Sequence, residues 1–269
     1  MSELNYKISY TQSGLADIKA SLQRHGLWLR MGIRDVALEH ARAALGILWP
    51  LIGALGWITI VYLFLGSSLS DNNPTYLAYL TIGIITYNYA SGILVGGVSC
   101  FQRFKGVILN LPNPLFIYPL RLFVKVAFGV SLQTIFIIGA LFICKIEPSW
   151  NWLYILPGLF AFAVTGVFLS LIMGIVGIIV GDLRFLMQSV MRLLMFATPI
   201  FWYPSEAGAR MIATQYNPLA HYISIIRDPL LGQPINMVSI WVVVGCTVAS
   251  IAIGMAMFHR SRNDIVRKL

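Results

Sequence analysis

Residues that could carry acid–base or metal chemistry are few in this chain, and they stand at the flanks of its apolar stretches. The 269 residues include ten acidic side chains and four histidines. The sequence contains no paired carboxylates, Ser/His/Asp set, metal-spaced His cluster or GxxxxGK[ST] phosphate loop. It therefore predicts no catalytic residue, no metal site and no cofactor in this chain. An ion-coupled transporter usually needs a carboxylate or histidine at membrane depth, so energy for any uphill transport would come from another polypeptide.

Aromatic side chains are plentiful where acids are absent. Tyr87 and Tyr89 lie well inside one apolar stretch. Tyr62 lies in the stretch before it, and Trp202 follows a later one. Tyr and Trp commonly anchor helices at the membrane surface or pack between them. Their rings also stack on apolar faces such as those of sugars, without demanding one hydrogen-bond pattern. We predict that these four residues line a path for a glycan, with anchoring and packing as the alternative.

Long uncharged stretches set the fold class. The chain is 58% hydrophobic and only 11% charged, whereas soluble domains carry about 25% charged residues. A helix of about 20 apolar residues crosses a membrane. Lipid offers no hydrogen-bond partners, so the backbone amides and carbonyls of such a segment must bond one another within a helix. We predict an all-α integral membrane protein with six transmembrane helices, near residues 46–66, 76–98, 120–144, 153–180, 185–202 and 236–258.

The distribution of the basic residues along the chain predicts the membrane topology. With those six helices, sixteen of the nineteen Lys and Arg residues fall on one side of the membrane, and the other side holds Lys145, Arg210 and Arg227. This split follows the positive-inside rule, so we predict that both termini are cytoplasmic. The net charge of +9 is thereby explained without a nucleic-acid partner.

Three parts follow from this pattern: a cytoplasmic N-terminus (1–47), a transmembrane domain (48–259) and a cytoplasmic tail (260–269). Apolar and basic residues alternate before the first span, which predicts an amphipathic helix lying on membrane lipids. A solvated helix beside the membrane is the alternative. Within the transmembrane domain, we expect a short cytoplasmic helix at residues 102–111, with an ordinary connecting loop as the alternative. We expect short re-entrant or interfacial helices at residues 207–231 on the outer side. Pro199 is expected to kink the fifth span.

Several motifs together resemble the membrane subunit of ABC exporters for bacterial surface polysaccharides, with O-antigen exporters the most similar and capsule and teichoic acid exporters related. The motifs are RDVALEHARAALGILW at Arg34–Trp49, the segment Pro112–Arg121, ATPIFW at Ala197–Trp202, YNPLAH at Tyr216–His221 and IRDPLLG at Ile226–Gly232. Their order and spacing carry the resemblance, because each motif alone is weak. It extends over nearly the whole chain from Trp28.

The resemblance implies a homodimer with a channel between its copies and two separate ATPase subunits that bind ATP and Mg²⁺. It implies three groups of functional residues. The channel entrance would include Leu45 and Gly46, with Arg30, Arg34 and Arg42 as attractors for a lipid diphosphate. Binding of these arginines to membrane lipid headgroups is an equal alternative. The segment that docks on the ATPase would include Gln102, Arg103, Phe104 and Lys105. The periplasmic gate would include Pro199, Tyr216, Asn217, Pro218, His221, Arg227 and Asp228. The sequence around Arg42 departs from the family, because relatives carry a more polar run there.

The function expected from this resemblance is export of an undecaprenyl-diphosphate-linked polysaccharide across the bacterial inner membrane, in which the chain would reside. In this reading the chain is a transport subunit rather than an enzyme, and ATP is hydrolysed on its partner. Three alternatives stay open: an ABC permease for a small lipid or drug, a membrane glycosyl- or acyltransferase, and a passive channel. The lack of catalytic acids and histidines disfavours the transferase.

Overall fold

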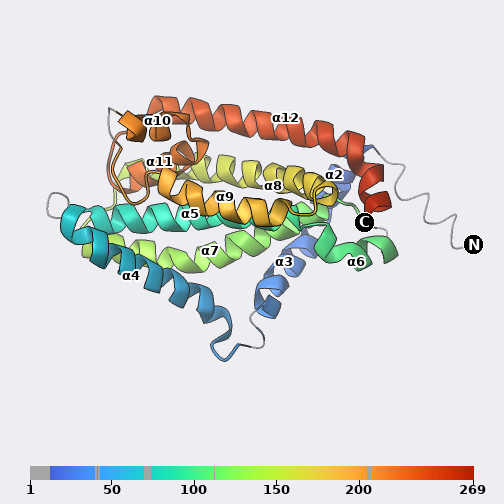
Figure 1. The fold of residues 1–269 in the computed structure, drawn as a ribbon, viewed down its shortest axis with the longest axis horizontal. Coiled ribbons are helices and arrows are strands. Elements are labelled where there is room, and N and C mark those ends of the chain that lie inside the picture. The colour runs from blue at the N-terminus through green and yellow to red at the C-terminus, as the bar shows by residue number, and fades with distance from the viewer. Residues whose placement is uncertain (1–12, 40, 42, 70–73, 112, 205–207) are drawn as a thin grey trace, which may run out of the picture.

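The protein folds as a helical bundle in a computed structural model, which describes residues 13–39, 41, 43–69, 74–111, 113–204 and 208–269 (Figure 1). These described residues form eleven α-helices and no strand. The α-helices are α2 (Gly14–Gln23), α3 (His25–Glu39), α4 (Trp49–Leu69), α5 (Tyr76–Val98), α6 (Lys105–Asn110), α7 (Ile117–Ile143), α8 (Ile155–Ile179), α9 (Leu183–Ala197), α10 (Gly208–Tyr216), α11 (Pro218–Leu230) and α12 (Met237–Lys268). Short 3-10 helices are η1 (Gly46–Leu48), η2 (Gln102–Phe104) and η3 (Trp150–Tyr154).

Among the described residues, five helices are long and apolar enough to cross a membrane, so the chain is a multi-pass helical membrane protein. These stretches are Gly46–Gly66, Tyr76–Val98, Ile117–Ile143, Trp150–Ile179 and Met237–Lys268. The remaining expected span, 185–202, is shorter in the structure. It corresponds to α9, which has 15 residues and ends at Ala197. Thr198 is extended, with ψ of 142°, because the residue before a proline is disfavoured in the helical region. Pro199 therefore stands beyond the end of the helix instead of kinking it.

Helix α5 occupies the centre of the bundle. Most of its residues from Tyr76 to Val98 are buried, in contrast to α4, whose outer faces are exposed. One side of α5 packs closely on α8. A Cβ atom on Gly97 would lie 2.9 Å from the Cα of Ser170, so the two backbones meet at a distance that only glycine permits. In Figure 1, α4 diverges from the bundle toward its N-terminal end.

Asparagine side chains begin two of the helices at the end of the bundle that holds α10 and α11. Asn217 accepts a hydrogen bond from the Leu219 amide at 3.0 Å, and Pro218 occupies the first helical position of α11. Asn236 accepts from the Val238 amide at 2.9 Å at the start of α12. Both arrangements satisfy amides that a helix leaves unpaired. We call this end of the bundle the α11 end.

The basic end of the bundle, opposite the α11 end, holds α2, α6 and the C-terminus (Figure 1). Asp17 of α2 is 1% exposed there and accepts from the Leu115 and Phe116 amides at 3.1 and 3.0 Å. Arg262 of α12 donates to the same carboxylate at 2.8 Å. Helix α12 thus continues past the predicted boundary at residue 259, and what was expected to be a tail is its last turns. The Asp17 carboxylate joins α2, the start of α7 and α12.

A second buried ion pair attaches α3 to α7. Arg121 donates two hydrogen bonds of 2.6 Å to the carboxylate of Asp35. Lys125 contacts Glu39 one turn farther along both helices, at 3.0 Å. The segment expected to lie on lipid is therefore held to the bundle through its acidic residues, while Arg30 and Arg34 are exposed.

Replacing Asp17 with Asn should lower the free energy of unfolding by about 3–5 kcal/mol, because the variant removes the charge of the carboxylate that pairs with the buried Arg262 guanidinium. The measurement is a denaturant titration of the purified protein in detergent. Asp264→Asn is the matched control, since Asp264 is exposed on the same helix as Arg262. Equal stability of the two variants would contradict the role assigned to Asp17.

Candidate functional site

One face of α5 carries small and polar residues. Asn88, Ser91, Val95 and Ser99 follow one another at spacings of three or four, with Gly92 beside them. Residues at these spacings share one helix face. This face is only partly covered within the protein, whereas the opposite face packs on α8. Such a face at membrane depth provides a groove for a polar molecule.

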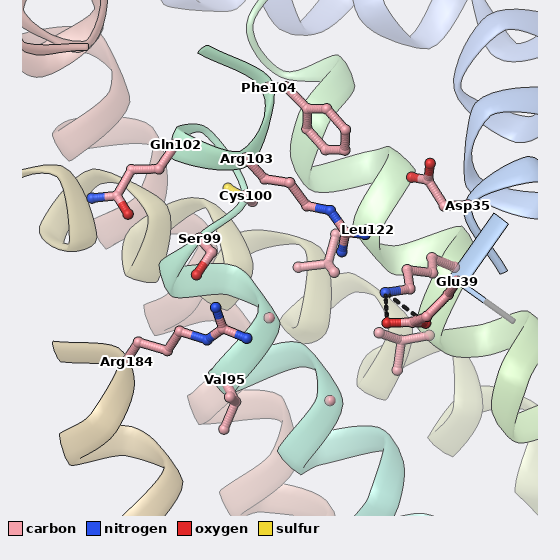
Figure 2. A pocket seen from close by; sticks show the side chains of 14 residues that line it. Asp35, Glu39, Val95, Ser99, Cys100, Gln102, Arg103, Phe104, Leu122 and Arg184 are labelled. Atoms are coloured by element: carbon pink, nitrogen blue, oxygen red, sulfur yellow. Dashed lines mark hydrogen bonds and ion pairs between the residues drawn. The ribbon is translucent and has the colours of Figure 1, made fainter. Parts of the chain in front are cut away.

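The basic end of this groove widens into a cavity of about 800 Å³ (Figure 2). Helices α3, α5, α7 and α9 and the short helix η2 all contribute to its wall. Figure 2 shows Arg184 extending from α9 toward Ser99 of α5, and Arg103 extending from η2 toward Leu122 of α7. The cavity thus receives arginine side chains from two elements that are far apart in the sequence.

The electrostatics of this cavity are positive. Of its charged side chains, Asp35 is paired with Arg121, and Glu39 is paired with Lys125. Within the described part of the chain, neither Arg103 nor Arg184 has an acidic partner. Guanidinium groups in this state favour a phosphate or carboxylate ligand, which they can bind through two parallel hydrogen bonds.

A second cavity, of about 490 Å³, continues the groove between α5 and α9. It shares Gly92, Val95 and Gly96 with the first cavity, so the two form one groove along α5. Tyr87, Asn88, Gln188 and Arg192 are among the other residues that line it. Hydroxyl, amide and guanidinium groups in a region between apolar helices can exchange hydrogen bonds with a hydroxyl-rich molecule.

Asn88 also forms a polar pair inside the bundle. Its side-chain amide nitrogen lies 3.1 Å from the side-chain oxygen of Gln133, which is buried on α7. Hydrogen bonds between amides at membrane depth hold helices together, because the alternative is an unpaired polar group in hydrocarbon. The pair therefore fixes the spacing of α5 and α7 beside the groove.

The segment expected to dock on an ATPase is anchored to the wall of the basic cavity. Phe104 stacks on Tyr118 with ring centroids 5.7 Å apart, and the guanidinium carbon of Arg121 lies 3.7 Å from the Phe104 ring centroid. Gln102 donates to the Gly177 carbonyl at 2.7 Å, and Lys105 is exposed. Through Phe104 and Arg121, a movement of this segment reaches the Asp35 ion pair and hence α3.

The residues expected to form a gate meet at the α11 end. Arg227 is 3% exposed, donates to the Pro199 carbonyl at 2.6 Å and lies 3.8 Å over the Tyr79 ring. Burial raises the pKa of Asp228, although neighbouring Arg227 opposes that shift. His221 contacts the Ser239 hydroxyl and the Gln215 carbonyl, each at 2.9 Å. Together these contacts attach α11 to the segment after α9 and to α12.

Two further gate residues occupy different positions. Asn217 contributes its amide nitrogen to Thr198 at 2.8 Å, so the cap of α11 is itself tied to the end of α9. Tyr216, in contrast, is 78% exposed at the end of α10.

Of the four aromatic residues predicted to line a path, Tyr87 lines the groove, and its hydroxyl bonds the Met191 carbonyl of α9. Tyr89 is on the other side of α5, in edge contact with Phe162 of α8 at 4.5 Å between centroids. Tyr62 stacks on Tyr76 at 6.3 Å between centroids. Trp202 donates to the Phe196 carbonyl at 3.0 Å. In this structure, Tyr62, Tyr89 and Trp202 therefore serve as packing residues.

The residues expected at an entrance are dispersed. Arg30, Arg34 and Leu45 are exposed, and Gly46 has a φ of +52°, which suits glycine alone. Arg42 lies outside the described residues. In place of that cluster, the structure brings Arg103 and Arg184 to one cavity. The sequence feature that could have located this cavity is the repeat of small and polar residues on α5, because these residues form the helix face that borders the cavity.

No group of three or more His, Cys, Asp or Glu residues in the described part of the chain is placed to hold a metal ion. Comparison with known protein families and with curated proteins finds no match to this chain.

A cysteine at position 91 should react with a small water-soluble thiol reagent, because Ser91 lines the groove. Ser170→Cys is the control, since Ser170 is 0% exposed at a comparable position on α8. Both are made with Cys144 and Cys246 replaced by Ala, and Cys100 is buried. Labelling of Ser91→Cys should be at least about tenfold faster. Equal rates would show that water does not enter the groove.

Proposed function

We propose that this chain is the membrane subunit of an ABC exporter that moves a lipid-linked polysaccharide, with O antigen as the first candidate cargo, across a bacterial inner membrane. Two copies form the path, and a separate ATPase subunit supplies the energy. The undecaprenyl-diphosphate group enters at the basic cavity, and the sugars follow along α5. The resemblance of the sequence motifs to polysaccharide exporters agrees with this assignment.

The observation that carries the proposal is the continuous groove along α5, with two unpaired arginines at one end. A lipid-linked glycan has a diphosphate beside its lipid and neutral, hydroxyl-rich units beyond it. Arg103 and Arg184 suit the diphosphate through charge-assisted hydrogen bonds. Asn88 and Gln188 suit hydroxyl groups. A drug or simple lipid would have little use for these amides at membrane depth.

The exposure of the groove supports the proposal of a second copy of the chain. Arg192 is exposed on α9, and Gln188 lines the groove one turn before it. Lipid-facing polar groups at this depth are costly, so they face a water-filled cavity or another protein surface. A second copy placed against the groove would convert two half-paths into one enclosed path.

Helix α9 serves as the sixth crossing in this proposal. The Asp17–Arg262 ion pair holds α2 and the last turns of α12 at the same end of the bundle, which requires an even number of crossings between them. The chain must also travel from the end of α8 to the start of α12. With 15 residues, α9 is about 22 Å long at about 1.5 Å per residue. The segment after it, which includes Pro199, completes the passage.

Energy reaches the path through η2 and α6. Their exposed residues, among them Lys105, offer a docking face for an ATPase at the basic end. Phe104 then transmits the movement to Arg121, which is bonded to Asp35 of α3. Since these groups border the basic cavity, ATP binding and hydrolysis on the partner would change the width of the entrance.

Cells that lack this chain should accumulate lipid-linked glycan on the inner side of the membrane and lose the long-chain glycan from their surface. Affinity purification of the chain from normal cells should recover an ATPase subunit with a phosphate-binding loop. Normal surface glycan in the deletion strain would reject the proposed cargo. Export by the reconstituted chain at full rate without an ATPase would reject the proposed energy source.

Replacing Arg103 and Arg184 together with Gln should reduce export at least about tenfold, because each side chain would lose a charge-assisted hydrogen bond to the diphosphate. Glycan appearing at the surface of complemented cells is measured over time. Arg260→Gln with Arg267→Gln is the control, since it removes the same charge from exposed sites at the same end. If the control variant lowers export as much as the Arg103 and Arg184 variant does, these two arginines contribute only to the general positive charge at this end of the protein.

A further inference from the structure

A separate cavity of about 430 Å³ lies at the α11 end. Its wall is built by the segment after α9, by α10 and α11, and by the start of α12, with Tyr79 contributed by α5. It shares no lining residue with the two cavities of the α5 groove. The cavity is therefore a second polar site, at the opposite end of the protein from Arg103 and Arg184.

The charges of this cavity are balanced. Arg227 and Asp228 line it together, with their nearest nitrogen and oxygen 3.6 Å apart. The Asp228 carboxylate also accepts from the Ser224 hydroxyl. Since each charge has its opposite beside it, the site offers no net attraction to an anion or a cation. Its chemistry differs in this respect from the positive cavity at the basic end.

Two polar atoms at this cavity form no hydrogen bond within the described residues: the Tyr203 hydroxyl, and the Arg227 Nε, whose ion-pair partner Asp228 is 3.6 Å away. Both residues line the cavity, and both atoms are buried. Burial raises the pKa of Tyr203 to about 12, so its hydroxyl keeps its proton at neutral pH and remains a donor. Buried polar atoms that form no hydrogen bond are rare in folded proteins, so these two atoms distinguish the wall of this cavity from the packed interior around it.

Aromatic and amide groups complete the site. The rings of Tyr79 and Tyr203 lie 4.5 Å apart between centroids, and the exposed Tyr216 ring borders the same cavity. Gln233 adds a side-chain amide. The cavity therefore combines an ion pair, side-chain amides and aromatic rings, with no net charge. This combination suits a ligand that has adjacent hydroxyl groups and an apolar ring face.

We propose that this cavity binds an uncharged sugar unit of the exported glycan as it leaves the protein. The inference rests on the proposed function and adds a second recognition step to it. Asp228 and Arg227 bond neighbouring hydroxyl groups, Tyr203 donates to a ring substituent, and Tyr216 packs on the sugar ring. The diphosphate is recognised at one end of the protein and the sugars at the other.

The test uses the full-length protein in detergent and the water-soluble glycan released by mild acid from the surface of cells that express it. Binding is followed by saturation-transfer NMR and titrated to saturation. Asp228→Asn removes the carboxylate charge with little change of shape, and Gln233→Ala removes an exposed amide whose loss leaves the fold intact. Asp228→Asn should weaken binding by about tenfold, the effect of one weakened hydrogen bond to a charged group, and Gln233→Ala by about threefold, the effect of one lost hydrogen bond between neutral groups.

Two exposed residues away from the cavity provide controls. Asp264→Asn matches the first substitution and Gln23→Ala matches the second, and both should bind the glycan as the unaltered protein does. Unchanged binding in both cavity variants would overturn the inference. Absence of glycan binding in the unaltered protein would overturn it too, leaving a cavity that holds water only. In either case the proposed function stands if the deletion strain still fails to export, and it falls if that strain exports normally.

Discussion

A buried carboxylate in an apolar bundle must be neutralised, and Asp17 satisfies this requirement by joining three helices. Its oxygens accept from the first amides around α7 and from the guanidinium of Arg262. The interaction fixes where α7 begins and where α12 ends relative to α2. Because Arg121 and Lys125 stand on the first turns of α7, the position of α3 follows from the same anchor. The ion pair of Asp17 thus helps to position α3 and α7, which form part of the wall of the basic cavity.

Helix α5 divides the protein into a packed side and an open side. Glycines such as Gly97 allow α8 to approach closely on one side, which buries Tyr89 and its neighbours. On the other side, Gly92 and Gly96 line the groove and also face α7 closely. A Cβ atom would lie 2.9 Å from the Val126 side chain if added to Gly92, and 3.0 Å from the Leu122 side chain if added to Gly96. Glycines therefore permit close helix packing on both sides of α5, against α8 through Gly97 and against α7 beside the groove.

The five long spans were predictable from their uncharged runs, because a charge at membrane depth is costly and rarely left unpaired. The start of α11 was also readable, since Asn217 followed by Pro218 is a helix-initiating pair. The pairings of Asp17 and Asp35 were not readable, because their partners lie 245 and 86 residues away. Charged residues from Arg260 onward suggested a tail, whereas their helix continues because Arg262 and Ile265 are buried. The cationic cavity also required the fold, since Arg103 and Arg184 come from distant segments.

Helix α12 has 32 residues without a break, which corresponds to about 48 Å at about 1.5 Å per residue. Its uncharged part, residues 237–258, accounts for about 33 Å of that length. This length matches the thickness of the hydrocarbon core of an ordinary bilayer. One end of this rod is fastened to α11 through Ser239 and the other to α2 through Arg262. A thicker or thinner bilayer cannot be accommodated by tilting this helix alone. The whole bundle must tilt with it, so the lipid chain length of the host membrane bears on the angle at which the groove stands.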